Sequence, residues 1–391
     1  MYSLLLAIIY LSFISLGLPD SLLGSAWPVM SGEIGASLSL AGPVSMIISA
    51  GTVFASLFAD RLTQRFHTRN VTAFSVLITA VALLGFARVR SYPVLCLLAV
   101  PYGLGAGAVD AALNNFVALH YKSRHMNWLH CFWGVGATIS PYIMSWAIGS
   151  ARGWRVGYGS VSLLQFGMAL ILVLTLPLWK KVPFADPTEE SQEGGTLTIM
   201  QALKMPGVKS SLVAFFSYCA LETTAGLWAS SFLVKIKGME AASAAGFASL
   251  FYLGITLGRF VSGFVADRVG DKNMIRIGVG LMALGVLMIL IPVKSATLAL
   301  VGLMVAGVGG APYYPALIHS TPDHFGRENS HAIVGLQMAS AYTGSALAPP
   351  VFGFLAQGIS LTMYPWYLAL FVILMGTLTE QANHRRKTAR S

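Results

Sequence analysis

The sequence predicts an all-α polytopic membrane protein, with twelve transmembrane helices in two pseudo-symmetric six-helix bundles. Composition, the length of the apolar segments and an internal repeat support this fold class. The chain has 391 residues, of which 55% are hydrophobic and only 10% charged. Soluble proteins carry about 25% charged residues. We therefore expect much of the surface to face lipid.

Twelve apolar segments are long enough to cross a bilayer, which takes roughly 20 residues for a helix. The pattern lacks the ~10-residue alternating segments of a membrane β-barrel. No basic segment or cleavage site marks the first stretch as a signal peptide, so we expect a membrane helix there. The stretches lie at 2–30, 38–58, 70–88, 93–120, 125–149, 155–178, 209–234, 242–265, 274–292, 296–319, 328–356 and 361–381.

One long polar interruption divides the chain. It covers residues 180–207, and its range 186–195 is rich in Pro, Glu and Gly, as flexible linkers are. Six apolar segments lie on each side. We expect an N-terminal six-helix bundle at 1–179, a cytoplasmic linker at 180–207, and a C-terminal six-helix bundle with a short basic tail at 208–391.

The two halves repeat each other. LFADRLTQRF at 57–66 aligns with FVADRVGDKN at 264–273, an offset of 207 residues. FWGVGATISP at 132–141 aligns with AYTGSALAPP at 340–349, an offset of 208. Near-equal offsets at two distant places indicate duplication. Parallel halves related by an axis along the membrane normal are a recurrent design of secondary transporters.

The basic residues are distributed unevenly between the two sides of the membrane. The net charge is +10, which alone could suggest nucleic-acid binding. If the N-terminus is inside, however, seventeen Lys and Arg (thirteen in loops and four in the tail) lie inside and seven outside. This bias is the positive-inside rule, so we expect both termini in the cytoplasm and the chain in the bacterial inner membrane.

The sequence carries no pattern that indicates an enzyme. It has no phosphate-binding Gly-Lys-Ser/Thr motif, no metal-ligand spacing and no catalytic triad. Its three cysteines, Cys96, Cys131 and Cys219, all lie in apolar segments and imply no disulfide. We expect neither a metal nor a cofactor.

Three acids lie deep within apolar segments: Asp20, Asp110 and Glu222. A charge in hydrocarbon is costly, so such residues usually face a cavity and are functional. A carboxyl group in an apolar cavity binds a proton more readily than one in water, as proton coupling requires. Each acid could instead be a polar contact between helices.

The surroundings of the acids differ. Asn114 shares a helical face with Asp110, and glycines before Asp110 allow a neighbouring helix to approach closely. Asp20 follows Pro19, which opens the backbone ladder, so we expect a bend there. Glu222 follows Tyr218 by one turn and could simply bond to a neighbouring helix.

Aromatic and amide side chains accompany the acids. Proteins bind sugars with rings that stack on C–H faces and polar groups that bond to hydroxyls. Alternatively, the Trp residues belong to the interfacial belt and His130 is a core histidine. Besides the three acids, the candidate solute-binding residues are Trp27, Asn114, His130, Trp133, Tyr218, Trp228, Tyr313 and Gln337.

A loop motif occurs once in each half. The Asp-Arg pairs Asp60–Arg61 and Asp267–Arg268 resemble the loop signature of major facilitator transporters, and Arg259 belongs to the fuller second copy. A carboxylate at a helix end can pair with an Arg or a helix N-terminus in one conformation only. We expect these five residues to act in gating, the alternative being ordinary interfacial charges.

The chain also resembles the fucose permease branch, the fucose–galactose–glucose:proton symporters. An acid in the first helix is matched by Asp20, and acid-Ala-Ala followed by Asn in the fourth is matched by Asp110 to Asn114. A polar residue before Phe in the fifth is matched by His130. The resemblance implies that Asp20 and Asp110 form the proton-coupling pair and that His130 is a sugar ligand.

We therefore expect proton-coupled uptake of a monosaccharide or a similar small polar metabolite by alternating access. The expected partners are the solute, protons and membrane lipid, the expected state is a monomer, and no nucleic acid is involved. Proton-driven export of drugs or metabolites and sodium-coupled sugar uptake are the alternatives. A sensor or scaffold without transport activity is a third, but no loop is long enough for an output domain.

Overall fold

The computed structural model describes residues 2–121, 123–150, 153–179, 199–293 and 295–390. All regular structure in these ranges is helical, which confirms the predicted fold class. The first half contains α1 (Tyr2–Asp20), α2 (Leu22–Glu33), η1 (Leu38–Leu40), α3 (Ala41–Phe66), α4 (Thr68–Arg88), α5 (Tyr92–His120), α6 (Ser123–Gly149), α7 (Gly153–Leu174) and α8 (Leu176–Trp179).

The second half follows a gap in the described residues. Its elements are α9 (Ile199–Lys204), α10 (Val208–Lys235), α11 (Ala241–Phe247), α12 (Ser249–Val269), α13 (Asp271–Leu290), α14 (Thr297–Gly310), α15 (Tyr313–His319), α16 (Thr321–Phe325), α17 (Arg327–Gly358), η3 (Leu361–Met363) and α18 (Tyr364–Arg390).

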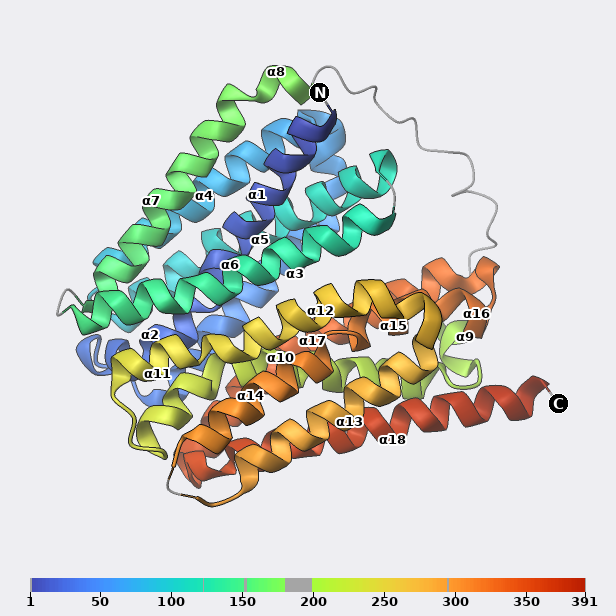
Figure 1. The fold of residues 1–391 in the computed structure, drawn as a ribbon. Coiled ribbons are helices and arrows are strands. Elements are labelled where there is room, and N and C mark those ends of the chain that lie inside the picture. Colours follow the sequence, from blue (N-terminus) through green and yellow to red (C-terminus); the bar gives the residue numbers. More distant parts are fainter. Residues whose placement is uncertain (1, 122, 151–152, 180–198, 294, 391) are drawn as a thin grey trace.

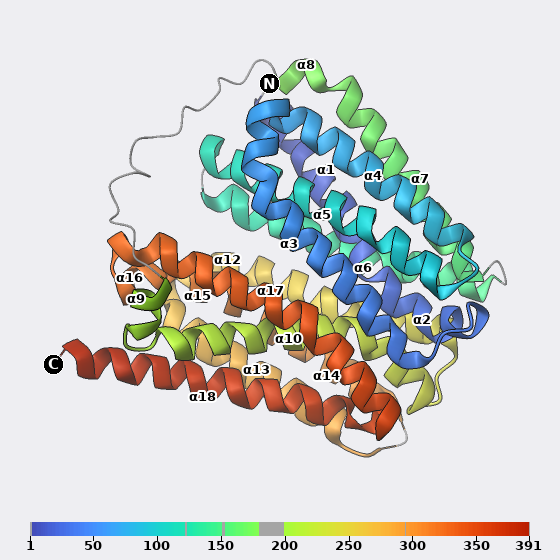
Figure 2. The ribbon, with the colours of Figure 1, turned by 180° about the vertical axis from the view of Figure 1, so that it is seen from behind.

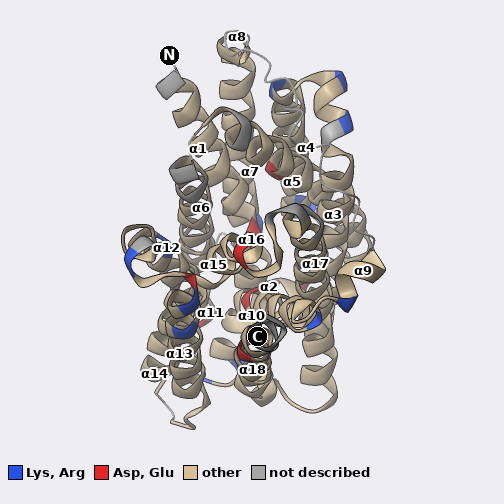
Figure 3. Ribbon diagram, turned by 90° about the vertical axis from the view of Figure 1, so that its right-hand side faces the viewer, with Lys and Arg blue, Asp and Glu red and all other residues tan. Residues whose placement is uncertain are grey.

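The helices correspond to the twelve predicted segments. In the described ranges, ten segments are long and apolar enough to cross a membrane. Helices α6 and α17, which are not among these ten, are long enough to cross by length alone, with 27 and 32 residues, or about 40 and 48 Å at 1.5 Å per residue. Charged side chains occupy few places on the ribbon (Figure 3). The chain is thus a polytopic membrane protein.

Figures 1 and 2 show two bundles, one formed by α1–α8 and the other by α9–α18. The bundles meet where α2, α11 and the ends of α10 and α17 lie side by side. They diverge toward the end that carries both chain termini (Figures 1 and 2). We call the first region the closed end and the other the terminal end. The helices of the two bundles therefore lie farther apart at the terminal end than at the closed end.

Glycines allow the bundles to touch at the closed end. A Cβ on Gly24 would lie 2.7 Å from carbonyl oxygens of α10, and one on Gly42 would lie 2.2 Å from the Cα of Pro350. Both distances are shorter than real Cβ contacts, so only glycine fits. The hydroxyl of Ser39 also donates a hydrogen bond to the side-chain carbonyl of Gln357. Backbone thus packs directly on backbone between α2 and α10, and between α3 and α17.

The first membrane segment is divided at the position where a bend was expected. Helix α1 ends at Asp20 after Pro19, and α2 begins at Leu22. The hydroxyl of Ser21, between them, donates to the carbonyl of Ala137 at 2.7 Å. This bond ties the break to α6. The eighth and tenth segments are also divided, between α11 and α12 and between α14 and α15, whereas α10 is continuous.

The two copies of the repeated loop turn at different places. Helix α12 ends before Gly270, which has φ 77° and ψ 149°. Helix α3 continues to Phe66, and its turn falls on His67 with φ 67° and ψ 143°. The first copy has Thr63 where the second has Gly270. A helix without glycine at that position runs on for about one more turn.

The structure describes parts of two predicted polar segments, the linker and the basic tail. Residues 180–198 of the expected linker 180–207 lie outside the described residues, and residues 199–204 form the short helix α9. The residues of the predicted basic tail up to Arg390 are helical and form the end of α18. Its composition of good helix formers favours this extension.

Candidate functional site

Asp20 lies at the break between α1 and α2 and faces two helices of its own bundle. Its Oδ1 accepts a hydrogen bond from the Tyr102 hydroxyl in α5 at 2.9 Å. Its Oδ2 accepts one from the Trp133 indole N–H in α6 at 2.7 Å. The carboxylate is nevertheless exposed. A carboxylate that contacts α5 and α6 and retains exposed surface faces space between helices rather than lipid.

Trp133 connects this acid to the second bundle. The guanidinium carbon of Arg259, in α12, lies 5.6 Å from the centre of the Trp133 ring, within the range of a cation–π contact. The ring of Tyr252, also in α12, meets Trp133 edge-on at 6.2 Å. A single indole therefore contacts an acid of one bundle and a cation of the other.

Glu222 extends the cluster into α10. Its Oε1 lies 4.0 Å from an Arg259 guanidinium nitrogen, and the two side chains are 16% and 13% exposed. We call Asp20, Trp133, Arg259 and Glu222 the central cluster. The cluster crosses the bundle interface: Asp20 and Trp133 belong to the first bundle, and Arg259 and Glu222 to the second. Such a cluster can hold a small polar molecule by charge, hydrogen bonds and ring contact.

Asp110 lies further along α5 than the central cluster. It follows Tyr102 by eight residues, about 12 Å along the helix axis. Its Oδ1 accepts a hydrogen bond from the Asn114 amide one turn later at 2.9 Å. Both side chains are half-buried. The expected Asp110–Asn114 face is therefore formed, and it adds a second acid to the first bundle toward the terminal end.

His130 precedes Trp133 by one turn of α6. Its half-buried ring meets Phe13 of α1 edge-on, with ring centres 6.0 Å apart. The indole of Trp133, one turn later, bonds to Asp20. His130 remains on the helix face that carries Trp133.

Several other predicted ligands are fully buried in helix packing. The indole of Trp27 donates to the carbonyl of Leu38, and that of Trp228 donates to the carbonyl of Pro349. Neither side chain has exposed surface. In this conformation both connect helices near the closed end rather than the central cluster.

The remaining predicted ligands lie within the second bundle. Tyr218 stacks on Tyr313 with ring centres 5.1 Å apart, and both are buried. Gln337, also buried, donates to the Ser211 hydroxyl and accepts from Thr321, each at 3.0 Å. These residues support the helix that carries Glu222 and have no exposed surface here.

The expected gating residues are only partly within the described structure. The side chains of Asp60 and Asp267 lie outside the described residues, so their pairing stays a prediction. Arg61 and Arg268 are exposed near the ends of α3 and α12. Arg259 was expected with them, but it lies nine residues before Arg268, about 13 Å along α12, and belongs to the central cluster.

Sequence reasoning missed Tyr102 and Tyr252. Each shares a helical face with a residue that was predicted: Tyr102 with Asp110 at a spacing of eight, and Tyr252 with Arg259 at a spacing of seven. That periodicity could have identified them. Their partners Asp20 and Trp133 lie in other helices, which the spacing alone does not reveal.

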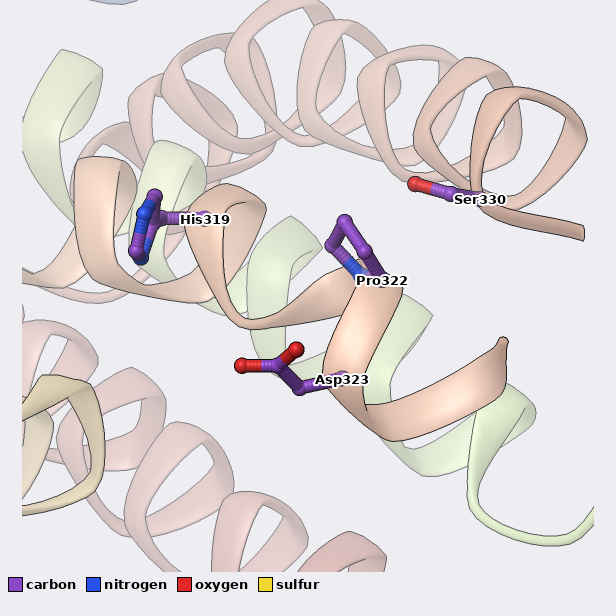
Figure 4. A pocket seen from close by; sticks show the side chains of 4 residues that line it. All are labelled: His319, Pro322, Asp323 and Ser330. Carbon is purple, nitrogen blue, oxygen red and sulfur yellow. The ribbon is translucent and has the colours of Figure 1, made fainter. Parts of the chain in front are cut away.

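A separate pocket of about 380 Å³ lies at the terminal end of the second bundle, lined by His319, Pro322, Asp323 and Ser330 from α15, α16 and α17 (Figure 4). None of these residues was predicted as a site residue. In the described part of the chain, no three His, Cys, Asp or Glu side chains gather closely enough to bind a metal ion.

Comparison with known proteins gives relatives at low identity. The chain is 23% identical over 352 residues to the cis,cis-muconate transport protein of Acinetobacter baylyi, covering 84% of this chain and 81% of that protein. It is 23% identical over 287 residues to "Bypass of stop codon protein 6" of Saccharomyces cerevisiae, covering 67% of this chain. The match spans just over half, 56%, of the yeast protein's length.

Solved structures share the fold. The nucleoside transporter NupG superposes with a TM-score of 0.75 at 14% identity, covering 97% of this chain and 98% of that one. A bacterial homologue of the human lysosomal transporter Spinster, in an inward-facing and occupied conformation, gives a TM-score of 0.69 at 14% identity, covering 100% and 97%.

The family pattern described as "Major Facilitator Superfamily" matches residues 9–250 and again 210–387. Together the two matches cover nearly the whole chain and both bundles. This agrees with the loop motif in each half and with the expectation of a transporter rather than an enzyme. The chain belongs to the Major Facilitator Superfamily.

Proposed function

We propose that this transporter is a proton-coupled symporter that takes up a small polar solute, of which a monosaccharide is the prototype. The observation that carries the proposal is Asp20, an exposed carboxylate between helices, bonded to Trp133, which in turn contacts Arg259. A solute in the central cluster touches both bundles at once. Its binding can therefore favour one relative position of the bundles over another.

The acids of the first bundle supply the coupling step. Asp20 and Asp110 take up protons from outside, the solute binds at the central cluster, and the bundles then close outside and open inside. Protonation removes negative charge from helix surfaces that must repack within the membrane, which lowers the cost of the movement. Asp20 and Asp110 lie on α1 and α5, so both proton-binding acids belong to the first bundle. That bundle also supplies part of the solute site.

The proposed orientation places the terminal end in the cytoplasm of a bacterium, with the chain in the inner membrane. The excess of Lys and Arg on that side supports this orientation. With the bundles touching at the opposite end, the structure then represents a state closed to the outside. Domain boundaries at 179 and 208, and a monomeric state, belong to this proposal.

The solute class follows from the groups that surround the centre. Trp133 and Tyr252 present ring faces and edges, while Asp20, Glu222 and Arg259 present hydrogen-bonding groups. Rings beside polar groups suit a hydroxylated molecule better than a purely apolar drug. The Acinetobacter relative is named for cis,cis-muconate transport, so a dicarboxylate belongs in the panel of trial solutes.

Transport in liposomes tests the coupling role of Asp110. We expect Asp110→Asn to lose pH-driven accumulation of the solute by tenfold or more, because an amide cannot carry the proton. Counterflow, which needs no net proton movement, is expected to persist. The matched control is Glu33→Gln, which removes an acid paired with Arg155 at the end opposite the chain termini.

Unchanged accumulation in Asp110→Asn would contradict the role of that acid. Accumulation in wild type that depends on sodium and not on a pH gradient would favour sodium coupling instead. A deletion strain that becomes sensitive to drugs, with no defect in solute uptake, would favour export.

A further inference from the structure

Arg259 is a largely buried cation, with 13% of its side chain exposed, and its donors have no hydrogen-bonding partner among the described residues. Within the described residues its guanidinium donates no hydrogen bond, and its Nε is buried without an acceptor. The acid paired with it, Glu222, lies 4.0 Å away, which is longer than a hydrogen bond. A buried, weakly paired charge is costly, so this arrangement is expected to serve a purpose other than stability.

The same chain forms a far better arginine–carboxylate pair elsewhere. Arg276 of α13 donates to both carboxylate oxygens of Glu380 in α18, at 2.6 and 2.7 Å. That is the bidentate geometry for which a guanidinium is suited. The pair of Arg259 and Glu222 also joins two helices of one bundle. It does not adopt the bidentate geometry. The donors of Arg259 therefore remain available to a carboxylate from outside the chain.

The position of Arg259 brings such a carboxylate to the bundle interface. Its guanidinium lies over Trp133, which belongs to the opposite bundle and is bonded to Asp20. A solute carboxylate bound to Arg259 would compete with Glu222 of the second bundle for the guanidinium donors. It would also lie near Asp20 of the first bundle. The two acids of the central cluster, Asp20 and Glu222, and its one arginine give it a net charge of −1 when all three are ionised. An anion then enters favourably together with protons.

We propose that Arg259 binds a carboxylate group of the transported solute, so that the small polar solute of the proposed symport carries a carboxylate, as a sugar acid or another small organic acid does. This inference rests on the proposed proton-coupled symport at the central cluster. Arg259 recognises the carboxylate of the solute, and Glu222 competes with that carboxylate for the guanidinium donors. Trp133 and Tyr252 then contact the remainder of the molecule.

A panel of matched solutes tests the inference on the purified full-length protein. The pairs are D-galactose with D-galacturonate, D-glucose with D-gluconate, and glycerol with glycerate, together with cis,cis-muconate. Thermal stabilisation reports binding, because a ligand of the folded state raises its apparent stability. We expect at least one acid to bind at least tenfold more tightly than its neutral partner. Liposome uptake with and without a pH gradient is measured for the same panel.

Substitutions of Arg259 and of Glu222 are expected to change the affinity for the acid in opposite directions. Arg259→Gln should weaken binding of the acid by about 10- to 100-fold, the equivalent of one bidentate charge-assisted contact. Glu222→Gln removes the competitor and should tighten it several-fold. If the pair were merely structural, both variants would lower the melting temperature and weaken binding alike. Arg276→Gln, which breaks the better pair, is the control and should leave binding of the acid unchanged.

The outcomes separate this inference from the proposed function. Failure of every acid in the panel to stabilise the protein overturns the inference. Proton-driven accumulation of a neutral member, with equal binding in Arg259→Gln, overturns it while leaving the proposed symport intact. If no member accumulates in response to a pH gradient, the proposed symport fails as well.

Discussion

The carboxylate of Asp20 receives two hydrogen bonds from different helices of one bundle, and in the described structure no Lys, Arg or His lies within ion-pairing distance of it. Hydrogen bonds to a charged group contribute about 1.5–3 kcal/mol each. Tyr102 and Trp133 thus hold an ionised acid in place without neutralising it. An acid held in this way retains its capacity to accept a proton.

Removing one donor tests this arrangement. Tyr102→Phe keeps the ring packed between helices but leaves Asp20 with one hydrogen bond fewer. We expect proton-driven accumulation to fall about tenfold, roughly 1.4 kcal/mol, while the melting temperature changes little. Tyr364→Phe is the control, because the Tyr364 hydroxyl donates to a neutral backbone carbonyl, that of Ala225. Equal losses in the two variants would contradict a specific role for Tyr102.

At the residue scale, sequence reasoning located charged groups better than their partners. An acid within an apolar segment is conspicuous by itself, so Asp20, Asp110 and Glu222 were all identified. Arg259 was predicted as part of the loop motif of Asp267 and Arg268, whereas its side chain also contacts Trp133 of the other half. Contacts between residues more than a hundred positions apart depend on packing that no local pattern encodes.

At the level of helices, the closed end depends on glycine. Residues of α2 and α3 meet α10 and α17 at distances that admit no side chain on Gly24 or Gly42. Side chains of small volume allow close helix approach in membranes, where packing rather than the hydrophobic effect holds helices together. Contacts made by glycine have no side chains of their own to disengage, so they are suited to an interface that opens during each cycle.

A methyl group at this contact should shift the conformational equilibrium. We expect Gly42→Ala to favour the state open at the closed end, because its Cβ would lie 2.2 Å from the Cα of Pro350. A cysteine at Ser39, in a background without Cys96, Cys131 and Cys219, should react with an impermeant maleimide several-fold faster. Gly32→Ala is the control, since no atom lies within 4 Å of its added Cβ.

A second control separates a shift between states from a loss of folding. In Gly136→Ala the Cβ would lie 2.1 Å from the carbonyl oxygen of Ile14, within the first bundle. That variant should lower the melting temperature without raising the reactivity of the cysteine. If Gly42→Ala behaves in the same way, its contact is structural and not part of a gate.

The ends of α3 and α12 differ although the two loop sequences align, because the residues at the turn differ. The aligned loops predict equivalent turns, yet α3 runs about one turn further than α12 because Thr63 replaces the glycine found at Gly270. The absence of that glycine is visible in the sequence. The place where the helix finally stops, His67 with φ 67°, is not, because a positive φ at a non-glycine residue is set by tertiary context.

For the whole molecule, apolar length and the repeat were sufficient to predict the fold. Twelve hydrophobic segments and a duplicated motif leave few alternatives in a bilayer, where every backbone group must be bonded internally. The relative position of the bundles could not be predicted in this way. Both states of an alternating-access carrier contain the same helices, so the pattern of apolar residues does not distinguish them.

The orientation can be tested with reporter fusions. With the terminal end in the cytoplasm, a green fluorescent protein joined after Ser391 should fluoresce, and alkaline phosphatase at the same point should be inactive. Alkaline phosphatase inserted after Ser360, between α17 and α18, should be active because that turn lies on the other side. The reverse pattern would contradict the orientation that the charge distribution predicts.

The backbone contacts at one end have a mechanical consequence for the other. The contact at Pro350 lies about 35 Å along α17 from its start at Arg327, so a rotation of about 10° around the glycine contacts displaces that far end by roughly 6 Å. A small displacement of the helices at the closed end, such as one added methyl group would cause, is therefore accompanied by a several-fold larger displacement at the terminal end. Distance probes placed near Trp179 and Arg327 would therefore register the smallest steric change at Gly42 most sensitively.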